Sequence, residues 1–317
     1  MQKKFYAGID VGGMSIKSGI IDQDGKVLFK SSTSTKTGAM NALTQEFNRI
    51  KEQDQKFGYG IKSVGIGIPC LFDNQKGIIS YGNNLGFDNF NVRQFAKQNY
   101  GYDIVLDNDA TCAVYGEYVF GKGKGYKNVV LITVGTGIGC GIVLDGKKIP
   151  SYSSAVGELS HTVVKIGGRK CNCGRRGCYE AYASTSALIK DTKIAMRKNK
   201  DSLMWQTYNL STVNGKTVFE YYHKDVVAKK VLDNFVKMVG VGVVNIANLM
   251  RPDIILIGGA ISAQNELFIK PLKEILNREI FAIEHERAMP LEQAVLQNDA
   301  GIIGAASLTI DSKGEKN

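Results

Sequence analysis

Three short apolar segments separated by glycine-containing turns make up the stretch Phe5-Tyr-Ala-Gly-Ile-Asp-Val-Gly-Gly-Met-Ser-Ile-Lys-Ser-Gly-Ile-Ile-Asp-Gln-Asp-Gly-Lys-Val-Leu-Phe-Lys30. Asp24-Gly25, placed between two apolar runs, is a strong signal for a β-hairpin. Gly12-Gly13 lies in the other turn, where glycine allows the backbone to bend tightly. We therefore predict three strands, at residues 5–10, 16–21 and 26–30.

The same arrangement recurs in Asn128-Val-Val-Leu-Ile-Thr-Val-Gly-Thr-Gly-Ile-Gly-Cys-Gly-Ile-Val-Leu-Asp-Gly-Lys-Lys-Ile149. Here the glycine-rich turn spans residues 135–139, and Asp145-Gly146 forms the second turn. One repetition at this distance predicts two α/β domains of related architecture, not a short-period solenoid. The length of 317 residues agrees with two domains of roughly 150 residues each.

Apolar periodicity predicts most of the remaining elements. Apolar residues at helical spacing predict a helix over residues 39–57. Residues 181–250 are predicted to be largely helical, with a polar break near residues 209–216. Apolar runs and their flanking residues predict strands at 63–68, 102–106 and 254–257, and a helix of small residues at 298–308.

The composition is that of an ordinary globular chain, with 44% apolar and 22% charged residues. The sequence has no apolar run of membrane-spanning length, so we expect no membrane partner. Residues 1–10 lack the apolar core and the cleavage site of a signal peptide. We therefore expect a cytoplasmic, reducing location, in which thiols are free or metal-bound.

The net charge of +10 is compatible with nucleic-acid binding, with a solvated basic surface and with attraction for an anionic substrate. No helix-turn-helix or RNA-binding motif accompanies the charge, so we expect no nucleic-acid partner.

Two common phosphate-binding motifs are not fulfilled. Residues 116–122 approach a Walker A motif, but Gly123 stands where Ser or Thr must reach magnesium. The second glycine-rich turn lacks the last glycine of a dinucleotide fingerprint, because that residue is Cys140, and the turn precedes a strand. What remains is a pair of tight turns, at residues 10–17 and 135–141, whose backbone N–H groups could point at phosphate oxygens. Plain hairpin turns are the alternative interpretation.

Three of the six cysteines follow a histidine in the pattern His161-x9-Cys171-x-Cys173-x4-Cys178. This stretch could be a nucleic-acid knuckle, a catalytic metal site, a disulfide clip or a structural staple. Its four soft ligands are enough for closed tetrahedral zinc and leave no position for a reactive water. A nucleic-acid knuckle usually carries stacking aromatic residues. Spacing alone leaves zinc and free thiols as the alternatives.

The ordered motifs of the chain resemble those of the ROK family, which includes repressors and bacterial glucokinases. The resemblance runs from about residue 5 to residue 308 and implies two actin-like ATPase (ribonuclease H-like) α/β domains around a cleft where ATP and a sugar meet. The implied division is residues 1–116 with 300–317, and residues 117–299 with the zinc loop. The motifs are Asp10-Val-Gly-Gly-Met-Ser-Ile-Lys17, Asn108-Asp-Ala110, Gly135-Thr-Gly-Ile-Gly139, Gly157-Glu-Leu-Ser-His161, Cys171-Asn-Cys-Gly-Arg-Arg-Gly-Cys-Tyr-Glu180 and Gly258-Gly259.

The resemblance implies ATP and Mg²⁺ as cofactors. Asp109 matches the catalytic base, which accepts the proton of the sugar hydroxyl. A helix cap or an Asn-Asp turn is the alternative for this residue. Asp10 matches the residue that holds the magnesium of ATP. The first phosphate loop is matched by Gly12, Gly13 and Lys17, the second by Gly135, Thr136 and Gly137, and the adenosine contact by Gly258 and Gly259.

The resemblance also implies a sugar site and structural zinc. The zinc ligands would be His161, Cys171, Cys173 and Cys178, and the metal would fix a loop with His161 at one end and Glu180 at the other. A turn rich in asparagine contains Asn84, which could add a sugar contact or serve only the turn. The matched hydroxyl-binding residues are Asn108, Asp109, Glu158, His161 and Glu180.

Four positions depart from the family pattern. Met14 replaces a Thr in the first phosphate loop, and Cys140 replaces a Gly in the second. Cys70 and Ser160 replace glycines near the implied sugar pocket. The last two departures bear on which sugar binds and not on the type of reaction.

We therefore expect ATP-dependent phosphorylation of a glucose-like hexose to the 6-phosphate. The alternatives are another sugar (allose, N-acetylmannosamine, N-acetylglucosamine or fructose) or a non-catalytic sugar sensor or repressor relative. A repressor would carry a DNA-binding segment, for which a first strand at Phe5 leaves no room. Family members often form homodimers or homotetramers, which is our expectation here.

Overall fold

The chain forms two compact units in the computed structural model, which describes residues 3–82, 85–149, 155–285 and 288–311. Unit 1 consists of Met1–Lys127, Gly141–Val156 and Val295–Asn317, and unit 2 of Asn128–Cys140 and Gly157–Ala294. The expected domain division, residues 1–116 with 300–317 and residues 117–299, stays a prediction.

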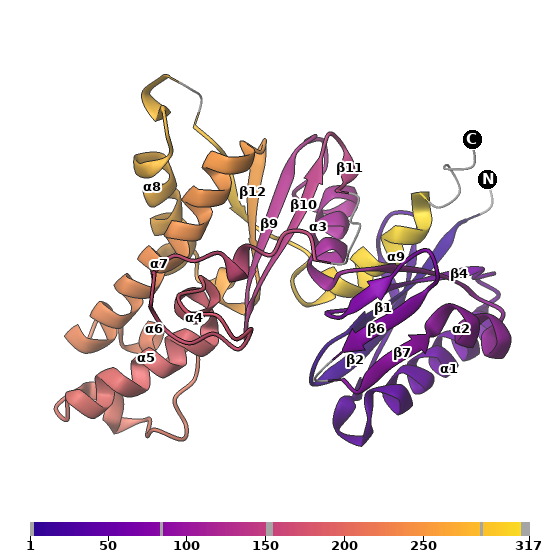
Figure 1. Cartoon of the computed structure of the whole chain (residues 1–317), viewed down its shortest axis with the longest axis horizontal. Helices are drawn as coiled ribbons and strands as arrows, with labels where there is room; N and C mark the ends of the chain where they lie inside the picture. The colour runs from indigo at the N-terminus through magenta and orange to yellow at the C-terminus, as the bar shows by residue number, and fades with distance from the viewer. Residues whose placement is uncertain (1–2, 83–84, 150–154, 286–287, 312–317) are drawn as a thin grey trace. The chain divides into compact units, whose positions relative to one another are not determined.

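A five-stranded sheet organises unit 1 (Figure 1). The predicted hairpins are present: β1 (Phe5–Val11) pairs antiparallel with β2 (Ser15–Asp22), which pairs antiparallel with β3 (Val27–Ser34). On the other side β1 runs parallel to β4 (Ser63–Gly67), and β4 runs parallel to β8 (Asp103–Asp107). The strand order is β3-β2-β1-β4-β8, so the carboxyl ends of β1, β4 and β8 lie at one edge.

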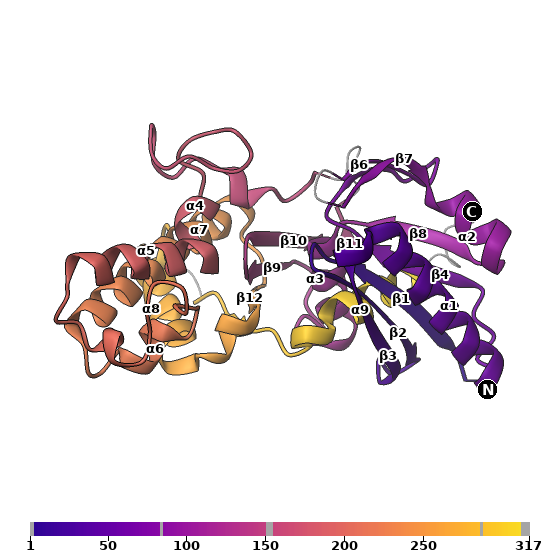
Figure 2. The ribbon, with the colours of Figure 1, turned by 90° about the horizontal axis from the view of Figure 1, so that it is seen from below.

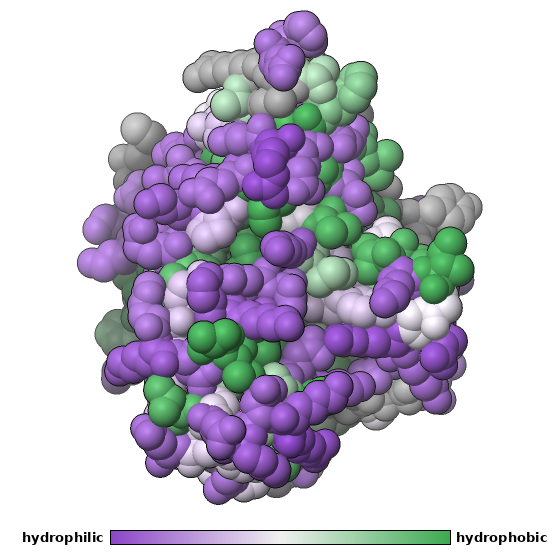
Figure 3. Space-filling view, turned by 90° about the vertical axis from the view of Figure 1, so that its left-hand side faces the viewer, coloured by the Kyte–Doolittle hydropathy of each residue, from purple (hydrophilic) through white to green (hydrophobic). Residues whose placement is uncertain are grey.

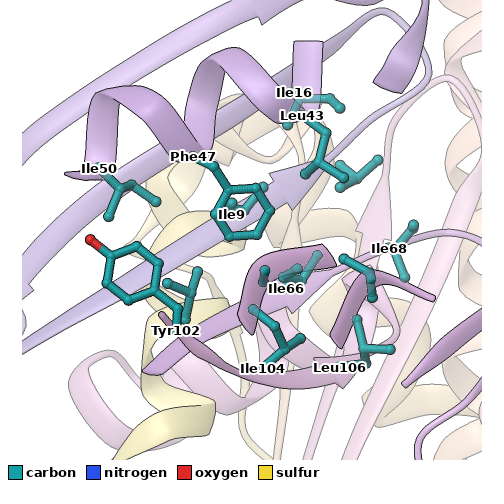
Figure 4. Packing of buried hydrophobic residues seen from close by; sticks show 14 of the residues in the cluster. Ile9, Ile16, Leu43, Phe47, Ile50, Ile66, Ile68, Tyr102, Ile104 and Leu106 are labelled. Atoms are coloured by element: carbon teal, nitrogen blue, oxygen red, sulfur yellow. The ribbon is translucent and has the colours of Figure 1, made fainter. Parts of the chain in front are cut away.

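Opposite faces of this sheet pack against different helices, because successive side chains of a strand point to opposite sides. On one face Ile9 belongs to the core that includes Leu43 and Phe47 of α1 (Ala39–Phe57), as Figure 4 shows. On the other face Gly8 lies against α9 (Ala300–Asp311), where an added Cβ would be 2.3 Å from the Ile302 carbonyl oxygen. The helix predicted over residues 39–57 is confirmed with these bounds.

The helix α9 lies close to its neighbours because of small residues on both sides. An added Cβ at Gly304 would be 1.8 Å from the Cys112 carbonyl oxygen of α3 (Asp109–Phe120). An added Cβ at Gly65 of β4 would be 1.7 Å from the Ala305 carbonyl oxygen. The predicted helix of small residues is therefore a buried element wedged between the sheet and α3.

Unit 1 also contains a three-stranded sheet that our sequence analysis did not predict. Its strands are β5 (Leu71–Asp73), β6 (Ile78–Gly82) and β7 (Phe87–Asn91), and β7 leads directly into α2 (Val92–Tyr100). The strands have only three to five residues, too few for an alternating pattern to stand out.

A second sheet has the order β11-β10-β9-β12-β13, which repeats the order of the first. The strands β9 (Val129–Val134) and β10 (Ile138–Leu144) flank the second glycine-rich turn, and β11 (Lys147–Lys148) follows Asp145-Gly146. Both β9 and β13 (Leu291–Gln293) run parallel to β12 (Ile254–Gly258). The repeated sequence pattern thus corresponds to a repeated topology.

Helices make up much of the remainder of unit 2 (Figure 2). The longest, α7 (Val226–Met250), packs against α4 (Glu180–Ala183), α5 (Thr185–Lys198), α6 (Thr217–Tyr221) and α8 (Lys270–Glu279). The face shown in Figure 3 is mostly hydrophilic, with apolar side chains in separate small patches. In the described part of the chain, no helix is both long and apolar enough to span a membrane.

Candidate functional site

Asp10 lies near the carboxyl end of β1, directly opposite Lys17 of β2. Burial raises the pKa of the Asp10 carboxyl, and the positive charge of Lys17 opposes this rise. The carboxylate packs on Gly301 at the start of α9, where an added Cβ would be 2.5 Å from Asp10 Cγ. Gly301 was missed by our sequence analysis, because its role depends on a contact between residues nearly three hundred positions apart.

The first glycine-rich turn follows Asp10 and is stabilised by hydrogen bonds, one within the turn and one from Thr35. The Gly12 N–H donates to the Ser15 carbonyl at 3.0 Å, and the Thr35 hydroxyl donates to the Gly13 carbonyl at 2.8 Å. Met14 lies at the tip with its side chain 83% exposed. The departure at residue 14 therefore places an apolar side chain in solvent at this turn.

Asp109 is the first residue of α3 and follows β8 by two positions. Asn108 caps this helix, since its Oδ1 accepts from the Ala110 and Thr111 N–H groups at 2.9 and 3.4 Å. The Asp109 Oδ1 also accepts from the Ala110 N–H at 2.9 Å. The capping alternative is thus realised by Asn108, and this geometry fixes the backbone on which Asp109 is presented.

Two further groups lie around the start of α3: Lys148, which the sequence did not single out, and Cys70, which it marked as a departure. Lys148 donates to Asp107 Oδ2 at 2.8 Å in a partly buried ion pair, and the Asp107 Oδ1 accepts from the Asn108 N–H at 2.9 Å. Burial raises the pKa of the Cys70 thiol to about 11, and the nearby negative charge of Asp109 adds to the rise. The thiol therefore stays protonated beside this carboxylate at neutral pH.

The parallel strands bring Asp10 and Asp109 to the same edge of the unit 1 sheet. Asp10 pairs with Gly67, and Gly67 pairs with Asp107 in the next strand. Neighbouring strands are about 4.8 Å apart, so Asp10 and the start of α3 are separated by only one intervening strand. In open α/β sheets, ligands bind outside the carboxyl ends of the parallel strands.

The second glycine-rich turn lies in unit 2 and is anchored by residues 180–186. The Thr185 N–H donates to the Gly135 carbonyl at 2.8 Å, and the Ser186 hydroxyl donates to the Thr136 carbonyl at 2.7 Å. Glu180 Oε2 accepts from the Ile138 N–H at 3.0 Å. Only a glycine at position 137 lets the Glu180 carboxylate lie this close to the turn, because an added Cβ would be 2.4 Å from Glu180 Oε2.

These anchors change the interpretation of Glu180. The family resemblance implies only a sugar contact for this residue, yet one of its oxygens accepts a backbone N–H of the glycine-rich turn. Thr185 and Ser186 were not singled out, because nothing in a local pattern shows which loop a helix N-terminus will contact. The turn is therefore a rigid element and not an open hairpin end.

Gly258 and Gly259 end strand β12. Gly259 has φ 90°, and an added Cβ would be 2.3 Å from the Val134 carbonyl oxygen, so only glycine fits. The Ser262 hydroxyl donates to the Gly259 carbonyl at 2.8 Å. The adenosine role of this turn stays a prediction.

His161, Cys171, Cys173 and Cys178 converge, with one ligand atom of each within 4.8 Å of the others. His161 Nδ1 lies 3.7 Å from Cys171 Sγ, and Cys173 Sγ lies 3.7 Å from Cys178 Sγ. Bonds of about 2.3 Å to zinc give a tetrahedron whose edge is about 3.8 Å. The four residues therefore fit a closed zinc site, and all six cysteines are free of disulfides.

One basic and two aromatic residues near this cluster have structural partners. Arg169 forms a two-pronged ion pair with Asp191, at 2.8 and 3.0 Å, and its guanidinium stacks on the Tyr182 ring. Tyr179 is fully buried and donates to the Val239 carbonyl at 2.8 Å. Because both tyrosines are buried, they are not available for stacking with nucleic-acid bases.

Glu158 precedes a short 3-10 turn, Leu159–His161, that leads into the cysteine cluster. The Ser160 hydroxyl donates to Glu158 Oε2 at 3.2 Å, and His161 Nε2 lies 3.8 Å from the same oxygen. Burial raises the pKa of the nearby Cys140 thiol to about 12, and the charge of Glu158 adds to the rise. His161 thus has one ring nitrogen toward the cysteines and the other toward a carboxylate.

The predicted site residues are distributed over both units. Asn84 lies outside the described residues. Unit 1 contains Asp10, Gly12, Gly13, Lys17, Asn108 and Asp109, and unit 2 contains Gly135, Thr136, Gly137, Glu158, His161, Cys171, Cys173, Cys178, Glu180, Gly258 and Gly259.

Two sheets of identical strand order, each with a glycine-rich hairpin turn, define a protein with the actin-like ATPase fold. The ROK glucokinase of Streptomyces griseus, solved with glucose and AMPPNP, has this fold and superposes with a TM-score of 0.82 at 28% identity, covering 96% of this chain and 98% of that chain. The chain belongs to the ROK family, whose model matches residues 6–312. The predicted fold class and family are therefore confirmed.

Relatives within the family differ in function. The glucokinase of Halalkalibacterium halodurans is 31% identical over 97% of this chain and 96% of its own length. The xylose repressor of Bacillus subtilis is 25% identical over 97% of this chain and 77% of its own length. Family membership alone therefore does not decide between a kinase and a regulator.

Proposed function

We propose that this protein is an ATP-dependent sugar kinase that phosphorylates a glucose-like hexose to the 6-phosphate. The observation that carries the proposal is the placement of Asp10 and Asp109 at the same carboxyl edge of the unit 1 sheet. Phosphoryl transfer needs one acid to hold the magnesium of the nucleotide and another to accept the proton of the acceptor hydroxyl. The similarity to glucokinases supports the choice of substrate class.

Asp109 is the base in this proposal. It would accept the proton of the sugar hydroxyl as that oxygen attacks the γ-phosphorus of ATP and ADP leaves. Mg²⁺, held through Asp10, would neutralise charge on the phosphates. The backbone N–H groups of residues 12–13 and 135–137 would contact phosphate oxygens, and Gly258 and Gly259 would contact adenosine.

The sugar hydroxyls would be bound by Glu158, His161, Asn108 and Glu180. Carboxylate and imidazole groups form strong hydrogen bonds with hydroxyls. Zinc held by His161 and the three cysteines would be structural, because four protein ligands leave no open position. The metal would fix the loop that has His161 at one end and Glu180 at the other.

A second candidate is a sugar sensor without turnover. Two observations favour it: the similarity to xylose repressors, and the exposed Met14 in the first glycine-rich turn, where a hydroxyl could have contacted phosphate. A kinase for another sugar is the third possibility, because Cys70 and Ser160 are departures near the implied pocket.

A coupled assay of ADP release tests the proposal with glucose, allose, mannose, fructose, N-acetylglucosamine and N-acetylmannosamine. We expect turnover to be fastest with glucose, and phosphorus NMR of the product to give a 6-phosphate. Tight binding of one sugar with no ADP release from any of them would favour the sensor. Faster turnover of another sugar would revise the substrate and keep the reaction.

A further inference from the structure

The carboxylate of Glu158 has two contacts on one oxygen. Its Oε2 accepts from the Ser160 hydroxyl at 3.2 Å and lies 3.8 Å from His161 Nε2. Ser160 is 4% exposed, whereas the Glu158 side chain is 47% exposed. A buried donor therefore holds a carboxylate that faces solvent.

The backbone explains why the hydroxyl reaches this oxygen. Residues 159–161 form a 3-10 turn in which the His161 N–H donates to the Glu158 carbonyl at 3.1 Å. The Thr162 hydroxyl donates to the Leu159 carbonyl at 2.7 Å, and the Tyr179 N–H donates to the Thr162 carbonyl at 2.8 Å. The turn is thus closed by its own hydrogen bonds and anchored at its C-terminal end, which keeps the backbone of Ser160 beside Glu158.

Both contacts are made with Oε2, and no hydrogen bond to Oε1 is found among the residues that the structure describes, so Oε1 is the oxygen that remains to accept from a ligand. A glutamate side chain with several rotatable bonds loses conformational entropy when it binds. A carboxylate already held in one orientation loses less, so its ligand binds more tightly. A carboxylate held in this way also favours a ligand that places a hydroxyl within hydrogen-bond distance of Oε1.

We propose that Ser160 is a positioning residue, which holds Glu158 as the acceptor of one particular sugar hydroxyl and thereby determines selectivity at that carbon. The inference rests on the proposed sugar-binding role of Glu158 and deepens it. Ser160 itself does not touch the sugar. A serine at this position supplies a hydrogen bond that the glycine of the family pattern cannot make.

Calorimetric titration without nucleotide tests this role separately from catalysis. The probes are D-glucose and its 1-, 2-, 3- and 4-deoxy analogues, titrated into the wild-type protein and the Ser160→Ala variant. Loss of one hydrogen bond to a charged group predicts about a 10-fold higher Kd for glucose. The analogue that lacks the hydroxyl contacted by Glu158 should bind both proteins with Kd values within about twofold, because the positioned acceptor has nothing to accept.

Two further variants separate positioning from general damage. Ser160→Thr keeps the hydroxyl and should restore the glucose Kd to within about threefold of wild type. Ser202→Ala removes another buried serine that donates to a carboxylate, Asp225 Oδ2 at 2.6 Å, and should leave the glucose Kd unchanged. In turnover assays, Ser160→Ala should raise the KM for glucose about 10-fold, with the KM for ATP and kcat within about threefold.

Each outcome decides one question. Equal loss of affinity for glucose and for all deoxy analogues would show damage to the pocket and overturn the inference, as would an unchanged glucose Kd in Ser160→Ala. Wild-type protein that binds no glucose would also overturn it. A wild-type protein that binds glucose without releasing ADP, and loses affinity in Ser160→Ala, would contradict the kinase proposal and keep the positioning role.

Discussion

Asp109 starts helix α3 on a backbone fixed by the Asn108 cap. Replacement by Asn removes the proton acceptor while keeping the size of the side chain. We expect Asp109→Asn to lower kcat by about 10²- to 10⁴-fold, the usual contribution of a general base, with sugar affinity still measurable. ADP release and calorimetric titration of glucose measure the two quantities.

The matched control for this variant is Asp103→Asn at the other end of β8. Asp103 is exposed and paired with Lys97 at 2.7 Å, so its loss should leave kcat within about twofold. Near-normal turnover in Asp109→Asn would exclude Asp109 as the base.

Ser186 anchors the second glycine-rich turn through its bond to the Thr136 carbonyl. If this turn contacts phosphate, loosening it should weaken nucleotide binding more than sugar binding. We expect Ser186→Ala to raise the KM for ATP about three- to tenfold, equivalent to a hydrogen bond of about 1 kcal/mol. The exposed Ser211, which donates only to Asn209 in its own turn, provides the control Ser211→Ala. An equal rise of the KM for sugar would contradict a selective role in ATP binding.

Single residues show where sequence prediction ends. The convergence of His161 with three cysteines could be predicted, because their spacing allows a shared metal and the family resemblance implies one. The bond from the Ile138 N–H to Glu180 could not, since it joins two segments forty-two positions apart. Ser160 was noticed as a departure, but its donation to Glu158 depends on the 3-10 turn.

At the scale of elements, α7 depends on its cap. Asp225 Oδ1 accepts from the Val227 and Ala228 N–H groups, and Oδ2 accepts from the Ser202 hydroxyl. Burial acts to raise the pKa of Asp225, but these hydrogen bonds outweigh it, and the pKa lies below its ordinary value. We expect Asp225→Ala to lower the free energy of unfolding by about 1–2 kcal/mol.

The lowered pKa of Asp225 also predicts how its contribution to the free energy of unfolding depends on pH. Because the folded-state pKa of Asp225 is lowered, its stabilisation is present above the unfolded value of about 3.9 and is lost as pH falls through the folded value. Urea unfolding at pH 7 and at pH 3 should therefore show a smaller difference between wild type and Asp225→Ala at the lower pH. Asp201→Ala, at an exposed position, is the control; an equal effect at both pH values would contradict the ionic cap.

Elements were predictable where apolar residues recur with the period of a strand or of a helix over enough residues. The hairpins around Asp24-Gly25 and Asp145-Gly146 and the helix over residues 39–57 have such patterns, and the structure contains them. The sheet of β5, β6 and β7 has strands too short for this signal. The place of α9 against β4 and α3 depends on Gly65 and Gly304, whose partners are distant in sequence.

At the scale of the whole molecule, the two units should respond differently to metal removal. All four candidate zinc ligands lie in unit 2, and so does Trp205, the one tryptophan of the chain. Tryptophan fluorescence therefore reports on unit 2, while circular dichroism reports on both units. Zinc that binds only the folded loop stabilises unit 2 by linkage.

We expect about one equivalent of zinc per chain, lost on treatment with a strong chelator or in the Cys173→Ser variant, because four ligands form one closed site. The thermal midpoint followed by Trp205 fluorescence should fall in both cases, while part of the circular dichroism transition, from unit 1, stays at its wild-type temperature. Cys70→Ser, a thiol of unit 1 outside the cluster, should keep its zinc and its fluorescence midpoint. Two results would contradict the zinc site: purified wild-type protein without bound zinc, or a chelator that leaves the fluorescence midpoint unchanged. The cluster would then be a set of free thiols, and the loop would be held by hydrogen bonds such as that from the Tyr179 N–H to the Thr162 carbonyl.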